Sequence, residues 1–98
     1  MRFKLDENLP VELVTDLRGL GHDADTALPN RILFTLDKGI ANLQRYPIHQ
    51  HAGVVLFRLD TSGRRAVIAF VRQRLHKVLD MHLAGRLTVV GPSGIRFR

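Results

Sequence analysis

The sequence predicts one α/β domain with a mostly parallel sheet. Short apolar runs typical of strands alternate with segments whose apolar residues recur every three or four positions, as in amphipathic helices. One run, GVVLFRL at residues 53–59, is apolar almost throughout, as in parallel strands that are covered on both faces. The chain of 98 residues is long enough for one hydrophobic core and too short for two, so residues 1–98 are expected to form a single domain.

The first unit is a strand at residues 3–5 followed by a helix at residues 9–20. Apolar residues at helical spacing define the buried stripe of this helix: Leu9, Leu13, Val14, Leu17 and Leu20. Asn8 is a favourable N-cap, and Pro10 lies in the first helical turn, where its missing N–H costs little. Gly21 is expected at the C′ position, which ends the helix.

The middle of the chain holds a candidate strand at residues 22–26 and a clear buried strand at residues 32–35, followed by a short helix through Ile40 and Leu43. A parallel crossover needs about a dozen residues and usually contains a helix, whereas only residues 27–31 separate these two strands. Three explanations remain open. The strands are not a parallel pair, residues 22–26 are not a strand, or the usual crossover helix is missing from this chain.

The last part of the chain predicts a strand within residues 53–59, a long helix and a C-terminal β-hairpin. The stripe of the helix is Val67, Val71, Leu75, Val78 and Leu79. The hairpin joins RLTVV at residues 86–90 to IRFR at residues 95–98 through a four-residue turn, GPSG.

Composition excludes several classes of protein. The chain has no cysteine, so disulfides and thiolate chemistry are absent, and no apolar run approaches the 18 or so residues that span a bilayer. Without a signal-peptide pattern at the N-terminus, a cytoplasmic protein with no membrane partner is expected. Residues 1–52 carry a net charge of −1 and residues 53–98 carry +7. This asymmetry suits a metal site beside a phosphate-binding surface, or simply a solvated basic face.

Two carboxylates are expected at one edge of the sheet. Asp6 follows the first strand and Asp37 follows the strand at residues 32–35, and ligands of open α/β sheets gather outside the carboxyl ends of the strands. Such a pair can hold Mg²⁺ or Mn²⁺, which prefer carboxylate and water oxygens. The alternative is that each Asp only caps the helix that follows it.

The motifs KLDENLPVELVTDLRGLGHDAD, RILFTLDKGIANL and GVVLFRL, in this order, resemble the small PIN-like family of predicted ribonucleases, relatives of VapC-type toxins. The resemblance spans nearly the whole chain. It implies a Rossmann-like parallel sheet and metal-dependent endoribonuclease activity. It also implies a role as the toxin of a toxin–antitoxin pair, neutralised by an antitoxin protein.

Carried onto this sequence, the resemblance makes Asp6 and Asp37 the catalytic, metal-binding carboxylates. The supporting residues at the same edge are Glu7, Asn8, Thr35 and Lys38. Two family features are missing here. One is an acidic ligand from a helix between the second and third strands, for which Asp23 or Asp25 is a candidate substitute. The other is the second acid of a TxDKD motif, since this chain has Gly39.

The basic half offers an RNA-contacting surface. Arg58, Arg65 and Arg72 are the candidates, and Arg65 and Arg72, seven residues apart, share a helix face. A solvated helix face is the alternative. His49 and His51 form a weaker candidate for a transition-metal site. The functional alternative to a ribonuclease is a catalytically weak or inactive PIN-like module that binds RNA or a protein partner, and a homodimer is a further possibility.

Overall fold

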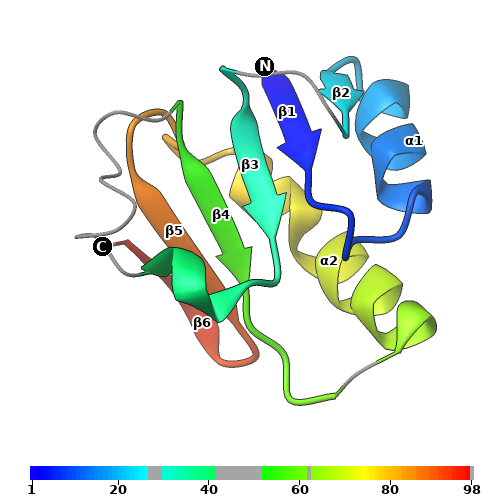
Figure 1. Cartoon of the computed structure of the whole chain (residues 1–98), viewed down its shortest axis with the longest axis vertical. Helices are drawn as coiled ribbons and strands as arrows, with labels where there is room; N and C mark the ends of the chain where they lie inside the picture. Colours follow the sequence, from blue (N-terminus) through cyan, green and yellow to red (C-terminus); the bar gives the residue numbers. More distant parts are fainter. Residues whose placement is uncertain (27–29, 42–51, 62, 98) are drawn as a thin grey trace.

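The computed structural model describes residues 1–26, 30–41, 52–61 and 63–97, and among them a six-stranded sheet with two helices. The strands are β1 (Arg2–Leu5), β2 (Asp23–Asp25), β3 (Ile32–Thr35), β4 (Val54–Phe57), β5 (Leu87–Gly91) and β6 (Gly94–Phe97). The helices are α1 (Glu12–Gly19) and α2 (Arg64–Leu79), and a 3₁₀ turn, η1, spans Lys38–Ala41. The strand order is β2-β1-β3-β4-β5-β6 (Figure 1).

The predicted α/β class and mostly parallel sheet are confirmed. Every neighbouring pair from β2 to β5 is parallel, and only the terminal β5–β6 hairpin is antiparallel. The hairpin turn is shorter than expected, because Gly91 and Gly94 already pair and leave Pro92 and Ser93 as the turn. Neither helix in the described part of the chain has the length and apolar character needed to cross a membrane.

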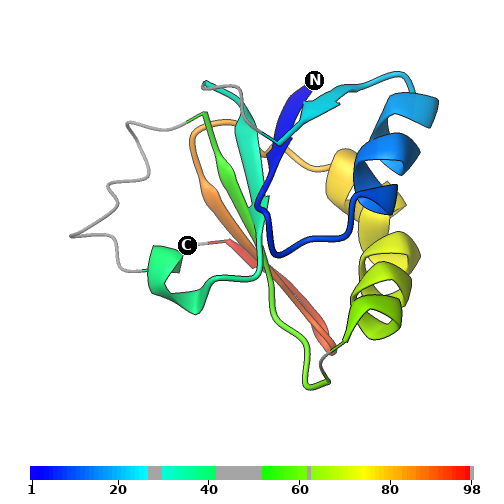
Figure 2. The same ribbon diagram turned by 45° about the vertical axis from the view of Figure 1, so that its right-hand side comes forward.

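Both helices lie on one face of the sheet, and η1 lies on the other (Figure 2). The helix-side core is built from alternate strand residues, with Phe34 at its centre, 5.0 Å from the ring of Phe3 and 5.2 Å from that of Phe57. On β4 the intervening residues, Val54 and Leu56, belong to a second buried cluster. All four β4 residues are therefore buried, as the uninterrupted apolar run predicts.

Helix α1 starts later than predicted. It begins at Glu12, its N-cap is Val11, and no side chain caps it, so the assignment of Asn8 as N-cap is wrong. The chain first turns through a hydrogen bond from Leu9 N–H to Asp6 O at 2.9 Å, and the residue before Pro10 is biased away from helical geometry.

The end of α1 follows the prediction at Gly21. Gly21 has φ 89° and donates its N–H to Arg18 O, while His22 N–H reaches Leu17 O at 3.1 Å. These two bonds are the Schellman arrangement, which needs a residue that tolerates positive φ at C′.

The short connection after β2 is resolved by the strand order. Residues 22–26 do contain a strand, but β2 and β3 do not pair with each other, since both pair with β1 from opposite sides. Asp25 is level with Lys4 and Ile32 with Phe3, so the chain moves back by only one residue along the strand direction. Sideways it passes one strand, β1, which is two strand spacings or about 10 Å. Six residues are enough for this path, and the crossover helix is not needed.

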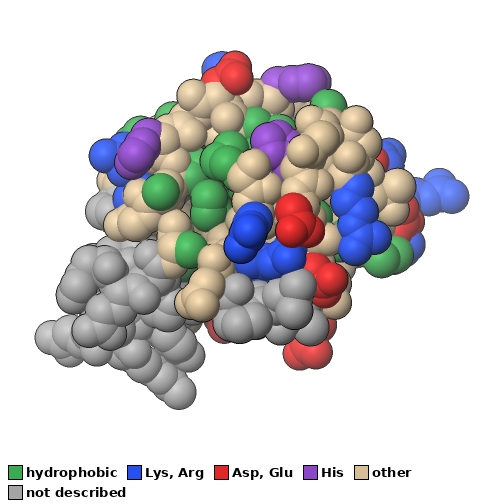
Figure 3. All heavy atoms as spheres, turned by 90° about the horizontal axis from the view of Figure 1, so that it is seen from above, with side chains coloured by type: hydrophobic (Ala, Val, Ile, Leu, Met, Phe, Trp, Pro, Cys, Tyr) green, Lys and Arg blue, Asp and Glu red, His purple; other side chains and the backbone are tan. Residues whose placement is uncertain are grey.

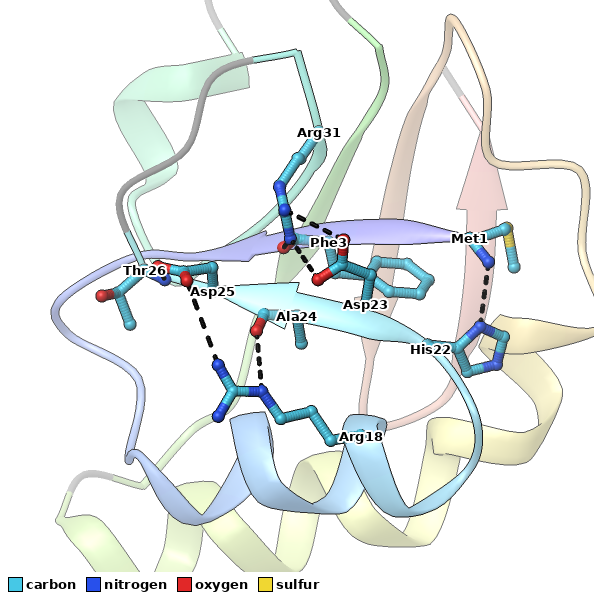
Figure 4. Close-up of polar contacts among 9 residues, drawn as sticks. All are labelled: Met1, Phe3, Arg18, His22, Asp23, Ala24, Asp25, Thr26 and Arg31. Carbon is cyan, nitrogen blue, oxygen red and sulfur yellow. Dashed lines mark hydrogen bonds and ion pairs between the residues drawn. The ribbon is translucent and has the colours of Figure 1, made fainter.

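Arg31 fastens the end of this connection (Figure 4). Its side chain is only 8% exposed, and its guanidinium donates two 3.0 Å hydrogen bonds to the Asp23 carboxylate and a longer one to Phe3 O. On the outer edge of β2, Arg18 Nε donates to Ala24 O at 3.0 Å. These arginines hold a three-residue edge strand that backbone pairing alone would hold weakly.

The described residues at the amino-terminal edge of the sheet form no patch of one charge sign. Figure 3 looks onto this edge and shows Lys and Arg side chains beside Asp and Glu, with histidines and hydrophobic side chains between them. These residues therefore do not form the basic surface that the sequence predicts.

Candidate functional site

The strand order changes direction at β1. The chain goes from β1 to β2 on one side and then returns to β3 on the other, so the carboxyl ends of β1 and β3 flank a switch point. In open α/β sheets, ligands bind in the crevice outside such a point. Asp6 directly follows β1, and Asp37 follows β3 after one residue, so both belong to this position (Figure 1).

Thr35 joins the two acidic positions. Its hydroxyl donates to Asp6 Oδ2 at 2.7 Å and accepts the Asp37 backbone N–H at 3.0 Å. Thr35 is 1% exposed, so this hydroxyl is held out of water and its bonds have fixed directions. The backbone adds a further tie, because Asp6 N–H donates to Phe34 O at 2.9 Å. We call Asp6, Thr35 and Asp37 the acid cluster.

The capping alternative applies to one acid and not to the other. Asp37 Oδ1 accepts the Gly39 N–H at 2.9 Å and so caps η1. Asp6 caps no helix, because α1 begins at Glu12 without a side-chain cap. A Cβ at Gly39 would lie 3.2 Å from Asp37 Oδ1, so the lack of a side chain at this position leaves room for the carboxylate.

A pocket of about 390 Å³ is lined by residues that follow Asp6 and Thr35 in the sequence, but not by Asp6, Thr35 or Asp37 themselves. Glu7 and Asn8 line it from the segment after β1, Leu36 from the segment after β3, and Leu59 and Thr61 from the segment after β4. Arg64 contributes from the start of α2. Two of the predicted supporting residues thus line one pocket, while Lys38, which is exposed, starts η1 directly after Asp37.

The two carboxylates of the acid cluster are a small set of protein ligands, but one that can hold a magnesium ion. Mg²⁺ keeps several waters and is often held by one or two protein carboxylates together with substrate phosphates. Asp6 and Asp37 can provide these carboxylates. Among the described residues there is no group of three His, Asp or Glu side chains that could hold a metal. Asp23 does not complete the set, because it pairs with Arg2 at the other end of the sheet and is bound by Arg31. Asp25 lies 3.9 Å from Arg18.

The predicted RNA-contacting arginines differ in their surroundings. Arg72 is bound to Asp16 of α1 through bonds of 2.6 and 3.1 Å, and this side-chain hydrogen bond, partly opposed by desolvation, raises the pKa of Arg72. Arg65 and Arg58 are exposed and form no side-chain hydrogen bond or ion pair with other described residues. Arg72 thus fastens α2 to α1, whereas Arg58 and Arg65 have no such partner in the described part of the chain.

Sequence reasoning missed the role of Arg64. Arg64 pairs with Glu12 across the α1–α2 seam, a contact between residues far apart in the sequence that no local pattern signals. His49 and His51 lie outside the described residues. His22 Nδ1 accepts a hydrogen bond from the Met1 amino group at 3.1 Å (Figure 4). Burial of the ring and, to a smaller extent, the positive charge of this amino group lower the pKa of His22.

Comparison with known proteins leaves the chain without an assigned relative, since no family model, no curated protein and no solved structure matches it.

Proposed function

We propose that this protein is a Mg²⁺- or Mn²⁺-dependent endoribonuclease of PIN-like type. The observation that supports this most is the acid cluster, in which a buried hydroxyl links Asp6 and Asp37 at the switch point of the sheet. The resemblance of the LDENLP and TLDK motifs to PIN-like ribonucleases selects RNA as the substrate. The role as a toxin, and the antitoxin partner that goes with it, depend on that resemblance alone, and a homodimer likewise stays a prediction.

The chain itself positions the carboxylates. The Thr35 hydroxyl orients Asp6, and the Gly39 N–H orients Asp37, so neither side chain has to be immobilised when a ligand arrives. A divalent ion held by Asp6 and Asp37 would lower the pKa of a bound water and neutralise charge on a phosphodiester. Arg58 and Arg65 attract the RNA backbone, and the 390 Å³ pocket lined by Glu7, Asn8 and Arg64 has room for a nucleotide base.

The experiment is RNA cleavage with added Mn²⁺ by the wild type and by Asp6→Asn. The substitution keeps the size of the side chain and an oxygen that can accept the Thr35 hydrogen bond, so the fold should be retained. We expect at least about a 100-fold loss of rate, because a metal supplies several kcal/mol of transition-state stabilisation and each 1.4 kcal/mol is tenfold.

Asp80→Asn is the matched control, since Asp80 is an exposed carboxylate at the other end of α2. It should cleave like the wild type. Equal activity of Asp6→Asn and Asp80→Asn would remove the metal-site mechanism.

A second candidate function is supported by the small size of the acidic set. Because no group of three metal-binding side chains is present among the described residues, a catalytically inactive module that binds RNA or a protein partner also fits the chain. A wild type that never cleaves RNA but binds it with a steep dependence on salt would select this function.

A further inference from the structure

A groove of about 760 Å³ lies between the second half of α2 and the turn that joins β5 to β6. Arg74 and Lys77 line it from the helix, and Pro92 and Ser93 line it from the turn. The turn follows the carboxyl end of β5, so the groove belongs to the same edge of the sheet as the acid cluster (Figure 1). Its volume lies within the range of ligand pockets.

Arg74 is held rigidly at this groove. Its guanidinium carbon lies 3.8 Å from the centre of the Phe70 ring, and Nη1 donates to Phe70 O at 3.1 Å. Nη2 reaches Pro92 O across the groove at 3.5 Å. One face of the guanidinium is therefore covered by an aromatic ring, and two of its nitrogens are directed at backbone carbonyls. An arginine held in this way cannot readily turn to clamp a phosphate, and it is suited instead to stacking through its second face.

The groove is also positively charged. Lys77 lies three residues after Arg74 on α2, is exposed, and forms no ion pair with other described residues. His76 adds an imidazole to the lining, and no Asp or Glu is among the described residues that line the groove. A flat cationic face next to an ammonium group matches a nucleobase next to a phosphate, because bases stack on guanidinium planes and phosphates attract lysines.

We propose that this groove binds single-stranded RNA, with one base stacked on Arg74 and an adjoining phosphate neutralised by Lys77. The choice of RNA rests on the proposed function, whereas the stacking geometry rests on the structure. β1, which leads into the acid cluster, and β5, which leads into the turn at the groove, are three strand spacings apart in the sheet, about 14 Å. The flat face favours a nucleic acid over an acidic peptide, which would need charge but no stacking plane.

The test is the binding of a short fluorescently labelled RNA, measured by anisotropy in EDTA so that no cleavage occurs. Arg74→Lys keeps the charge and removes the plane, and we expect it to weaken binding about tenfold with little change in salt dependence. Lys77→Gln should reduce the slope of log K against log salt by about 0.7, the value for one phosphate contact on a single strand.

Arg86→Lys is the matched control for Arg74→Lys, because it makes the same chemical change at an arginine that also lies over an aromatic ring, that of Phe97, but does not line the groove, and it should bind like the wild type. Melting temperatures show whether the variants fold, and Lys77→Gln, at an exposed position, tests the proposal even if Arg74→Lys is unstable. The proposal is overturned if Arg74→Lys and Lys77→Gln both bind RNA like the wild type. It is also overturned if an acidic peptide competes with equal affinity for both wild type and Arg74→Lys.

The groove and the proposed function fail separately. Arg74→Lys should weaken RNA binding in EDTA by the same factor in the Asp6→Asn background as in the wild type, because the acid cluster lies outside the groove. Loss of cleavage in Asp6→Asn, together with this unchanged factor, supports both proposals. If Arg74→Lys cleaves and binds RNA like the wild type, the proposed RNA site in the groove is refuted, while the proposed function of the acid cluster is unaffected.

Discussion

Replacing Thr35 by valine tests the acid cluster without touching a carboxylate. Valine has nearly the shape of threonine, so Thr35→Val keeps the packing of this 1%-exposed position and removes only the hydroxyl. The variant loses the 2.7 Å bond to Asp6 Oδ2 and the 3.0 Å bond from Asp37 N–H. A hydrogen bond to a charged group contributes about 1.5–3 kcal/mol, while the exposed Asp37 can recover a water for its N–H. The expected loss in the free energy of unfolding is about 2 kcal/mol.

The assay is urea denaturation of the wild type, Thr35→Val and Thr35→Ser. Serine keeps the hydroxyl and loses one methyl group, which costs about 0.8 kcal/mol, so Thr35→Ser should be the more stable of the two variants. For a chain of this size a loss of 2 kcal/mol also lowers the melting temperature by roughly 8–16 °C. If Thr35→Val is as stable as the wild type, the hydroxyl does not link the two acidic positions and the reasoning is refuted.

Three further predictions concern the amino-terminal edge of the sheet, at the opposite end of the strands from the acid cluster. Arg31→Met should lower the free energy of unfolding by about 2 kcal/mol, because it leaves the connection after β2 without the guanidinium that binds Asp23. A double-mutant cycle checks the pairing: in the Arg31→Met background, Asp23→Asn should cause no further loss of stability. Gly53→Ala should lower it by more than about 2 kcal/mol in the same urea assay, since φ is 138° and a Cβ would lie 2.4 Å from Leu83 O, and a neutral effect would contradict this close approach. The pKa of His22 is lowered on folding, so its contribution to stability is complete above about pH 6.5 and is lost as the pH falls through the folded value; denaturation from pH 8 to pH 5 should show this decline, and His22→Asn should flatten it.

The strands were the most predictable part of the fold. Residues 32–35 form β3 as predicted, because four residues of apolar and β-branched character between turn signals leave few alternatives. The start of α1 was not predictable from its stripe, since Leu9 is buried like the helical leucines although it belongs to the turn that precedes the helix. A periodic stripe shows which side chains are buried and not where helical hydrogen bonding begins.

The crossover after β2 shows a different limit of sequence reasoning. The rule that parallel strands need a long connection applies to a full-length return with a helix. Here the register of β2 and β3 on β1 removes most of that return, and register follows from pairing between residues far apart in the sequence. The buried Arg31 was equally invisible, because its partners become neighbours only after the sheet forms.

The candidate site was predictable in its location and not in its details. The position of Asp6 and Asp37 at one edge follows from the direction of the parallel strands alone. The hydroxyl bridge through Thr35 and the capping of η1 by Asp37 depend on side-chain rotamers, which a sequence pattern does not specify. Arg72 illustrates the same limit, since its place on an exposed helix face was foreseen but its ion pair with Asp16 of another helix was not.

The most direct test of the central claim is a Mn²⁺ titration followed by NMR of the backbone amides. A paramagnetic ion held by Asp6 and Asp37 should broaden the amide signals of Asp6, Thr35 and Asp37 first, and Asp6→Asn should abolish this broadening at the same Mn²⁺ concentration. Broadening centred on another part of the molecule, or broadening that persists unchanged in Asp6→Asn, would contradict a metal site at the β1–β3 edge.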